Sequence, residues 1–511
     1  MKDNKASFIY PLCLVLAAFI PGLLGSLAAT PVLTVDIPQN TVPRFERSGC
    51  AVDVPGPEKN KVECGYLVVP ENRQKRDGRL IRLPIIILKS NSPTPAPDPV
   101  LRTLGGPGAS SLRMLRGRQA SPWLDHRDQI IFEQRGTRYA QPNLDCPEVD
   151  AARFDNTKAN LDESTSILRE VTAAKKCRER LVKEGIDLAA YDSAQSAADI
   201  DDLRRVLGYQ KVNLYGVSYS ARLMMEVVRN YPDGVRSVVL ESTLPPSVNY
   251  DEVGVDAAVR ALNVLFRNCA ADAQCNRAYP KLEQVFYDLV RRANEKPIPF
   301  VIVQTSPGET FTIKLDGNDI TTWVLDYLLS GDPEGIADAP SQIFQVAKGD
   351  ASPLTAYAES KAGPGGFRAW GMRYSVWCRE EFPFENRRTI AAQSNRYPQL
   401  RGYSIQAPML AICDVWGVPP AKPVANKPVV SDIPTLIFSG EYDAYTPPSW
   451  GQLAAQTLRH SYYFEVPGVG HGPGFSSKCA RDMVAAFFDN PSVAPNDACL
   501  KAPTLKFTIR K

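Results

Sequence analysis

A serine that could act as a nucleophile lies in the segment NLYGVSYSARLMM, residues 213–225. Ser218 follows Gly216 by two residues and precedes Ser220 by two, at the end of an apolar run. A sharp turn from a strand into a helix holds its nucleophile in a strained backbone conformation, which only small flanking residues tolerate. The pattern predicts a nucleophilic serine, while an ordinary loop serine is the alternative. Ser220 is larger than the usual glycine, so the turn must accommodate its side chain.

A serine hydroxyl needs a base to remove its proton, and a carboxylate to orient that base. The chain contains three histidines. His471 lies in the glycine-rich segment PGVGHGPG, directly after an apolar run, where a side chain can project into a cleft. His126 precedes a predicted strand and His460 ends a predicted helix, so we expect both to be surface or cap residues. His471 is therefore the predicted base.

The predicted acid is Asp443, in the segment LIFSGEYDAYTPP that follows a short apolar run. Glu441 and Asp432 are the competing carboxylates nearby. The chain order Ser218, Asp443, His471 is that of α/β-hydrolases and differs from the order in other serine-hydrolase folds. This agreement makes a chance match at Ser218 a much weaker explanation.

Attack on a carbonyl carbon creates a negative oxygen, which backbone N–H groups must stabilise by roughly 3 kcal/mol each. The residue after the nucleophile, Tyr219, is one predicted donor. The segment LGGPGAS supplies the other, because its glycines let the backbone approach a substrate closely. We expect Gly106 to be this second donor, with Gly105 as the alternative.

The elements that must position these residues alternate along the chain. CGYLVVP and RLIRLPIIILKS are apolar runs around a turn-rich segment and predict an opening hairpin. Residues 193–208 have a helical pattern closed by Gly208, followed by a strand at 211–218, a helix at 220–234 and a strand at 235–243. This order predicts an α/β fold with a mostly parallel sheet flanked by helices.

The alternation fades after residue 245 into longer helical patterns and returns after a Pro-rich stretch at 417–428. We therefore expect an α/β-hydrolase core built from residues 45–245 and 426–500. Residues 246–425 would form a mainly helical insertion, or cap. A chain of 511 residues is long enough for such a division.

In residues 1–29, Lys2 and Lys5 come before an apolar stretch that ends in small residues, which resembles a signal peptide. Pro11 and Pro21 disfavour the alternative, a membrane anchor. The sequence therefore predicts a secreted or periplasmic protein with no stable membrane partner after cleavage. The net charge of +3 is too small to indicate a nucleic-acid partner.

Ten cysteines follow the predicted leader, and an even number in an exported chain indicates disulfides. Their order permits five pairs of sequence neighbours, but the sequence does not determine the pairing. With three histidines and no close C-x-x-C pair, neither a metal site nor another cofactor is expected. The cysteines are Cys50, Cys64, Cys146, Cys177, Cys269, Cys275, Cys378, Cys413, Cys479 and Cys499.

Several segments together resemble the prolyl and tripeptidyl aminopeptidase family of α/β-hydrolases. They are LGGPGAS, IIFEQRGT, YDSAQSAADIDDLRRVLGYQKVNLYGVSYS, YPDGVRSVVLEST, SGEYDAYTPP and GVGHG. The resemblance runs from about Cys50 to Cys499 and is weakest in the insertion. It implies a serine exopeptidase whose helical cap selects short peptides with a free N-terminus.

The resemblance also assigns roles to further residues. An Asp-Gln-Arg-Gly element of the family appears here as residues 133–136, with Glu133 in place of aspartate, and is expected to brace the active-site loops. Family members bind the substrate's amino group with cap carboxylates, which suggests Glu380 and Glu381 for that role; a solvated surface pair is the alternative. The aromatic residues near them are expected to be core.

The predicted function is hydrolysis of amide bonds near the N-terminus of short peptides through an acyl-enzyme. An esterase or other acyl hydrolase on the same scaffold is the nearest alternative, because the triad does not distinguish an ester from an amide. The remaining alternative is a binding protein that has the same fold but no catalytic activity. The sequence leaves the oligomeric state and the preferred side chains open.

Overall fold

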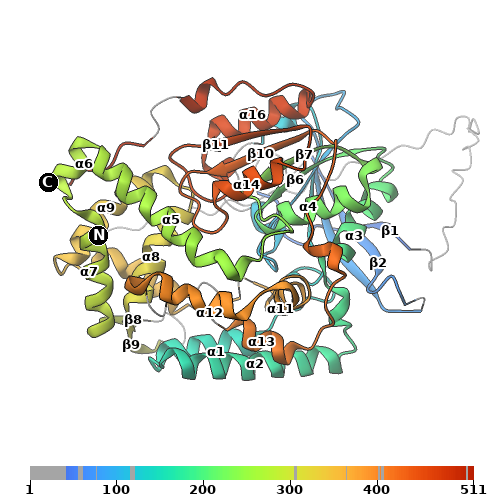
Figure 1. Ribbon diagram of the computed structural model, residues 1–511. Helices are drawn as coiled ribbons and strands as arrows, with labels where there is room; N and C mark the ends of the chain where they lie inside the picture. Colours follow the sequence, from blue (N-terminus) through green and yellow to red (C-terminus); the bar gives the residue numbers. More distant parts are fainter. Residues whose placement is uncertain are drawn as a thin grey trace, which may run out of the picture. The chain divides into compact units, whose positions relative to one another are not determined.

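A computed structural model describes residues 42–55, 61–75, 77–115, 121–303, 308–363, 365–366, 368–400, 403, 408–501 and 505–510 (Figure 1). The predicted leader, residues 1–29, lies outside the described residues. No helix among the described ranges has the length and apolar character needed to cross a bilayer.

A mostly parallel sheet forms the centre of the described chain (Figure 1). Its nine strands follow the order β1-β2-β3-β5-β4-β6-β7-β10-β11. The pairs from β1 to β5 are antiparallel, and all later pairs are parallel. The α/β fold and the opening hairpin, β2 with β3, are confirmed. The strands are β1 (Arg44–Arg47), β2 (Val62–Pro70), β3 (Leu80–Leu88), β4 (Val100–Thr103), β5 (Gln129–Phe132), β6 (Val212–Val217), β7 (Val235–Glu241), β10 (Thr435–Gly440) and β11 (Ser461–Val466).

Helices cover both faces of this sheet, which is why its central strands are buried throughout. Side chains alternate between the faces, so Leu214 packs with α3 and α4 while its neighbour Tyr215 packs with α16. The helices outside the insertion are α1 (Pro147–Lys158), α2 (Glu163–Lys183), α3 (Ser193–Val206), α4 (Tyr219–Asn230), α14 (Pro448–Ala455), α15 (Pro473–Ser476) and α16 (Lys478–Asp489).

The chain between β7 and β10 builds a second hydrophobic core. Tyr442 and Ala444, which flank the predicted acid, belong to this core, so the insertion packs directly on the acid's turn. A hairpin, β8 with β9, interrupts the expected helices, because the β-branched run at 298–303 exposes alternate side chains. The elements are α5 (Tyr250–Ala271), α6 (Ala273–Ala278), α7 (Leu282–Glu295), β8 (Ile298–Val303), β9 (Thr310–Leu315), α8 (Gly317–Leu329), α9 (Pro333–Ala347), α10 (Thr355–Lys361), α11 (Trp370–Glu380), α12 (Arg387–Arg396) and α13 (Met409–Trp416).

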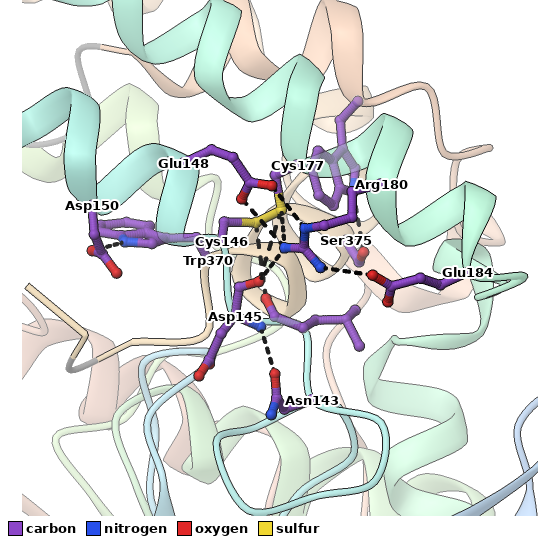
Figure 2. Close-up of a disulfide and its surroundings, with 12 residues drawn as sticks. Asn143, Asp145, Cys146, Glu148, Asp150, Cys177, Arg180, Glu184, Trp370 and Ser375 are labelled. Carbon is purple, nitrogen blue, oxygen red and sulfur yellow. Dashed lines mark hydrogen bonds and ion pairs between the residues drawn. A yellow bond between two sulfur atoms is a disulfide. The ribbon is translucent and has the colours of Figure 1, made fainter.

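All ten cysteines that follow the predicted leader form disulfides, and each disulfide joins two cysteines that are consecutive along the chain. Cys146–Cys177 joins the start of α1 to α2, where Arg180 also holds Glu148 at 2.7 Å (Figure 2). The α1–α2 hairpin is thereby fixed at one end. The other pairs are Cys50–Cys64, Cys269–Cys275, Cys378–Cys413 and Cys479–Cys499.

Candidate active site

Ser218 occupies the sharp turn between β6 and α4, with φ 62° and ψ −129°. This left-handed backbone is unusual for a residue with a side chain and is typical of a strained functional turn. Gly216 makes the turn possible, because a Cβ atom there would lie 2.5 Å from the carbonyl oxygen of Ser220. The small residue two positions before the serine is therefore a steric requirement.

The side chain of Ser220 fits inside this turn by bonding to its backbone. Its buried hydroxyl accepts a hydrogen bond from the N–H of Val217 at 2.7 Å and lies 2.9 Å from the carbonyl oxygen of Thr103. The hydroxyl thus ties the start of α4 to the ends of β6 and β4. The departure from the family's usual glycine is accommodated by these contacts.

Replacement of Ser220 by alanine is expected to lower the free energy of unfolding by about 1–3 kcal/mol, because the buried Val217 N–H loses its acceptor. Urea unfolding of both proteins measures the difference. Ser48→Ala, which removes an exposed hydroxyl, is the matched control and should leave the midpoint unchanged. Equal midpoints for all three proteins would contradict a structural role for the Ser220 hydroxyl.

The loops that follow β6, β10 and β11 leave the same edge of the sheet, because these strands are parallel. His471 and Asp443 meet there, with 2.9 Å between the imidazole Nδ1 and the carboxylate Oδ2. The carboxylate is fully buried and also accepts hydrogen bonds from the N–H groups of Tyr445 and Thr446, both at 2.9 Å. These bonds fix the orientation in which the carboxylate faces the ring.

Burial by itself raises the pKa of Asp443, but the His471 ring and the backbone N–H of Thr446 outweigh it and hold the pKa below its ordinary value. Asp443 therefore stays ionised at neutral pH. A fixed negative charge next to Nδ1 keeps the proton on that nitrogen and leaves Nε2 free to accept one.

The competing side chains are engaged elsewhere. Glu441 accepts hydrogen bonds from Asn268 at 2.8 Å and from the N–H of Gly468 at 2.9 Å. Asp432 forms an exposed ion pair with Arg459, and the Nδ1 of His460 lies 2.9 Å from the backbone carbonyl oxygen of Asp432. Neither carboxylate contacts His471.

Thr446 is a site residue that sequence reasoning did not identify. Its hydroxyl donates to the Asp443 carboxylate at 2.8 Å and lies 3.2 Å from Nδ1 of His471. The signal was present, since a hydroxyl three residues after an acid is typical of a turn closed by the acid's side chain. The Thr446 hydroxyl adds a fourth hydrogen bond to the carboxylate, after those from His471 and the two backbone N–H groups.

A cavity of about 550 Å³ brings Ser218 and His471 together with Tyr219, Gly105 and Gly106. The backbone N–H groups of Tyr219 and Gly106 donate no hydrogen bond to the described residues, which leaves them available to a ligand. A Cβ atom on Gly105 would lie 2.9 Å from the nitrogen of Tyr219, so only glycine allows the two loops to approach this closely. Both residues line the same cavity as Ser218.

Residues 133–135 brace this edge of the sheet. The Glu133 carboxylate accepts hydrogen bonds from the Ser111 N–H at 2.7 Å and the Ser110 hydroxyl at 3.0 Å, and Gln134 donates to the carbonyl oxygen of Leu104 at 2.5 Å. Arg135 forms a fully buried pair with Asp199 at 2.7 Å. Both ends of the glycine-rich loop are therefore fixed to the segment that directly follows β5.

Glu380 and Glu381, the pair expected to bind the substrate's amino group, are not among the residues that line this cavity. Glu381 forms an ion pair with Arg222 of α4, and Glu380 accepts from the N–H and hydroxyl of Ser193 at 2.6 and 2.7 Å. Burial raises the pKa of each glutamate to about 7, against the opposing effect of Arg222. Their role in the structure is to connect α11 to α3 and α4.

A second cavity of about 890 Å³ adjoins the first. Four residues line both: Arg153, Glu170, Arg368 and Trp370. The second cavity lies among α1, α2 and α8 and is rich in carboxylates, including Asp326. The two cavities together offer room for a ligand larger than one residue.

The family models agree with this fold. A model described as alpha/beta hydrolase fold matches residues 100–267, and a model described as TAP-like protein matches residues 401–499. These two matches cover the predicted nucleophile and the predicted acid and base. The chain therefore has the α/β-hydrolase fold, and its residues 401–499 are similar to TAP-like proteins.

Within that class, the chain is homologous to named peptidases, which confirms the family resemblance. It is 24% identical over 470 residues to serine protease Hip1 of Mycobacterium tuberculosis, covering 85% of this chain and 86% of that protein. It is equally identical to the tripeptidyl aminopeptidase of Streptomyces lividans, covering 86% and 83%. A solved structure of a proline iminopeptidase from Mycobacterium smegmatis has 15% identity and a TM-score of 0.34, covering 84% of this chain and 98% of that one.

Proposed function

We propose that this protein is a serine hydrolase that cleaves amide bonds near the free N-terminus of short peptides. The observation that carries the proposal is the 2.9 Å contact between His471 and the buried Asp443 beside a cavity that also holds Ser218 on its strained turn. The names of the two relatives, a serine protease and a tripeptidyl aminopeptidase, support a peptide substrate.

In the first half-reaction, the Ser218 hydroxyl oxygen attacks the carbonyl carbon while Nε2 of His471 takes its proton. Asp443 stabilises the resulting imidazolium through its hydrogen bond to Nδ1. The N–H groups of Tyr219 and Gly106 stabilise the negative oxygen. When the C–N bond breaks, His471 returns the proton to the leaving amine and the acyl group stays on Ser218.

In the second half-reaction, a water molecule takes the place of the leaving amine. His471 removes a proton from the water as it attacks the acyl carbon, and returns the proton to Ser218 when the ester bond breaks. No metal ion or other cofactor is part of this scheme.

The substrate's amino group requires a carboxylate, and Asp326 on α8 is the one we assign. It lines the second cavity and has no ion pair with any residue in the described ranges. Glu170, the carboxylate common to both cavities, already pairs with Arg153 at 3.2 Å. A charge-assisted hydrogen bond to an ammonium group is about twice as strong as a neutral one.

We place the mature protein outside the cytoplasm, in the extracellular space or the periplasm. The five disulfides support this location, since such bonds persist in oxidising compartments. The signal-like segment at residues 1–29 supports it as well. Short peptides are the expected partners, and nucleic acids are not.

A test of the proposed function compares two tripeptide coumarylamides that differ only in N-terminal acetylation. We expect acetylation to lower kcat/KM by roughly tenfold or more, because the charged amino group is lost. Asp326→Asn should remove most of this difference, whereas the exposed Asp432→Asn should not. Mass spectrometry of products from a peptide library then gives the number of residues released.

Two results would contradict the proposed function. Fast hydrolysis of a small neutral ester without turnover of either peptide would favour the esterase. Failure of a fluorophosphonate probe to label Ser218 in the folded protein would favour a binding protein that has kept the fold.

A further inference from the structure

The cavity that holds Ser218 contains more positive than negative side chains. Among its charged lining residues are three arginines, Arg153, Arg368 and Arg373, and one carboxylate, Glu170. A site that only received an ammonium group would favour the opposite balance. The excess of guanidinium groups indicates that the cavity also binds a negatively charged group.

Two of the three arginines already have polar partners. Arg373 donates to the carbonyl oxygen of Gly106 at 2.6 Å, which positions the glycine-rich loop. Arg153 pairs with Glu170 at 3.2 Å. Both groups therefore serve the protein's own structure.

Arg368 differs from them in its surroundings. Within the part of the chain that the structure describes, its guanidinium makes no hydrogen bond or ion pair, and it lies over the Trp370 ring, 5.3 Å from the ring centroid. It lines both cavities, at the place where they join. A substrate that extends from Ser218 into the second cavity passes this group.

The structure holds Arg368 in place from two sides. Its neighbour Ala369 donates to the carbonyl oxygen of Gly108 at 2.9 Å, which ties this segment to the glycine-rich loop. On the other side, the indole of Trp370 donates to Asp150 of α1 at 2.9 Å (Figure 2). Because Cys146–Cys177 fixes α1 to α2, the stacking surface under Arg368 is preorganised.

The electrostatic surroundings of Arg368 favour an anion. Burial lowers the pKa of Arg368, and the nearby charge of Arg153 acts in the same direction. The nearby groups that act to raise this pKa are the phenols of Tyr250, Tyr374 and Tyr445. A partly buried guanidinium without a carboxylate partner gains most from a ligand that supplies one, because its planar fork donates two parallel hydrogen bonds to a carboxylate.

We propose that Arg368 is a carboxylate-binding residue of the substrate cavity, and that the enzyme prefers peptides that place a carboxylate against it. The carboxylate belongs either to an aspartate or glutamate side chain or to the C-terminus of a short peptide. This inference rests on the proposed function, since it names the substrate class of the same site. It adds a specificity that the triad and the amino-group contact do not provide.

The experiment uses purified full-length enzyme and two sets of matched peptides. One set exchanges Glu for Gln at each position, and the other exchanges a C-terminal carboxylate for an amide. We expect the preferred carboxylate peptide to exceed its neutral partner in kcat/KM by roughly 10- to 100-fold. The set that shows the preference identifies the source of the carboxylate.

Arg368→Gln should reduce this ratio towards one. Arg368→Lys, which keeps the charge but loses the fork, should retain part of it and serves if the glutamine variant does not fold. Arg459→Gln, at an exposed ion pair, is the matched control and should keep the wild-type ratio. Circular dichroism and urea unfolding check the fold of each variant.

Equal turnover of carboxylate and neutral peptides by the wild type would overturn the inference, and so would a preference that persists in Arg368→Gln. Either result leaves the proposed function intact as long as the wild type cleaves peptides. Absence of peptide cleavage together with unlabelled Ser218 would instead overturn the proposed function.

Discussion

Replacing Ser218 with alanine is expected to lower kcat for peptide hydrolysis by about a million-fold, because a triad whose members act as a unit fails when the nucleophile is removed. The residual rate would come from the oxyanion donors and from substrate binding. The structure predicts a small effect on stability, since alanine fits the space that the serine leaves. Turnover of the free tripeptide coumarylamide measures the loss, with active-site titration of the wild type as the reference.

The control for this prediction is Ser48→Ala, which removes an exposed hydroxyl and should keep full activity. Fluorophosphonate labelling should disappear in Ser218→Ala and persist in the control. A folded Ser218→Ala protein that keeps more than about a hundredth of the wild-type kcat would show that another group carries out the attack.

The chain order of the site could be predicted because local chemistry limits the choices. Three histidines leave few candidates for a base, and only His471 follows a strand in a glycine-rich loop. Parallel strands carry their C-terminal loops to one edge of the sheet, so an acid after β10 and a histidine after β11 meet as a consequence of the topology. The contact between Asp443 and His471 therefore follows from elements that the sequence indicates.

The surroundings of Glu380 and Glu381 could not be predicted in this way. Their partner Arg222 lies on α4, about 160 residues earlier, and nothing in the helical pattern of α4 shows that it faces α11. The resemblance suggested that two adjacent acids in the insertion would face the substrate. In the structure, the two carboxylates pair with Arg222 inside the protein, where an unpaired carboxylate would lower the free energy of unfolding.

The excess of arginines over carboxylates in the cavity could not be predicted from the sequence either. Arg153 comes from α1, Glu170 from α2, and Arg368 and Arg373 from a segment about 200 residues later. None of them belongs to a motif, and their proximity depends on how the α1–α2 hairpin contacts α11 and α13 (Figure 1). Site residues on separate helices are found only when the packing is known, whereas those on strand ends follow from the order of the strands.

Replacing Asp443 with asparagine is expected to lower kcat by roughly ten-thousand-fold while leaving the fold intact. The carboxylate oxygens accept hydrogen bonds from two backbone N–H groups, the Thr446 hydroxyl and Nδ1 of His471. An asparagine amide has one carbonyl oxygen and one NH₂ group, which only donates, so it cannot accept all four bonds. The NH₂ group would face either the backbone or the ring, and the histidine would be held in the tautomer that cannot take the serine proton.

The measurement compares kcat for the free tripeptide coumarylamide between wild type and Asp443→Asn, with the exposed Asp432→Asn as the matched control. Urea unfolding should show that the variant remains folded. A loss of less than about tenfold in a folded protein would mean that another acid orients His471. Glu241 is then the group to test, because its carboxylate is buried at the end of β7 and holds the histidine loop through the N–H of Gly474 at 3.1 Å. Asp443 contacts the ring directly, whereas the Glu241 carboxylate bonds to the Tyr215 hydroxyl and to the segment that follows His471, so the two substitutions should differ in kcat by several orders of magnitude.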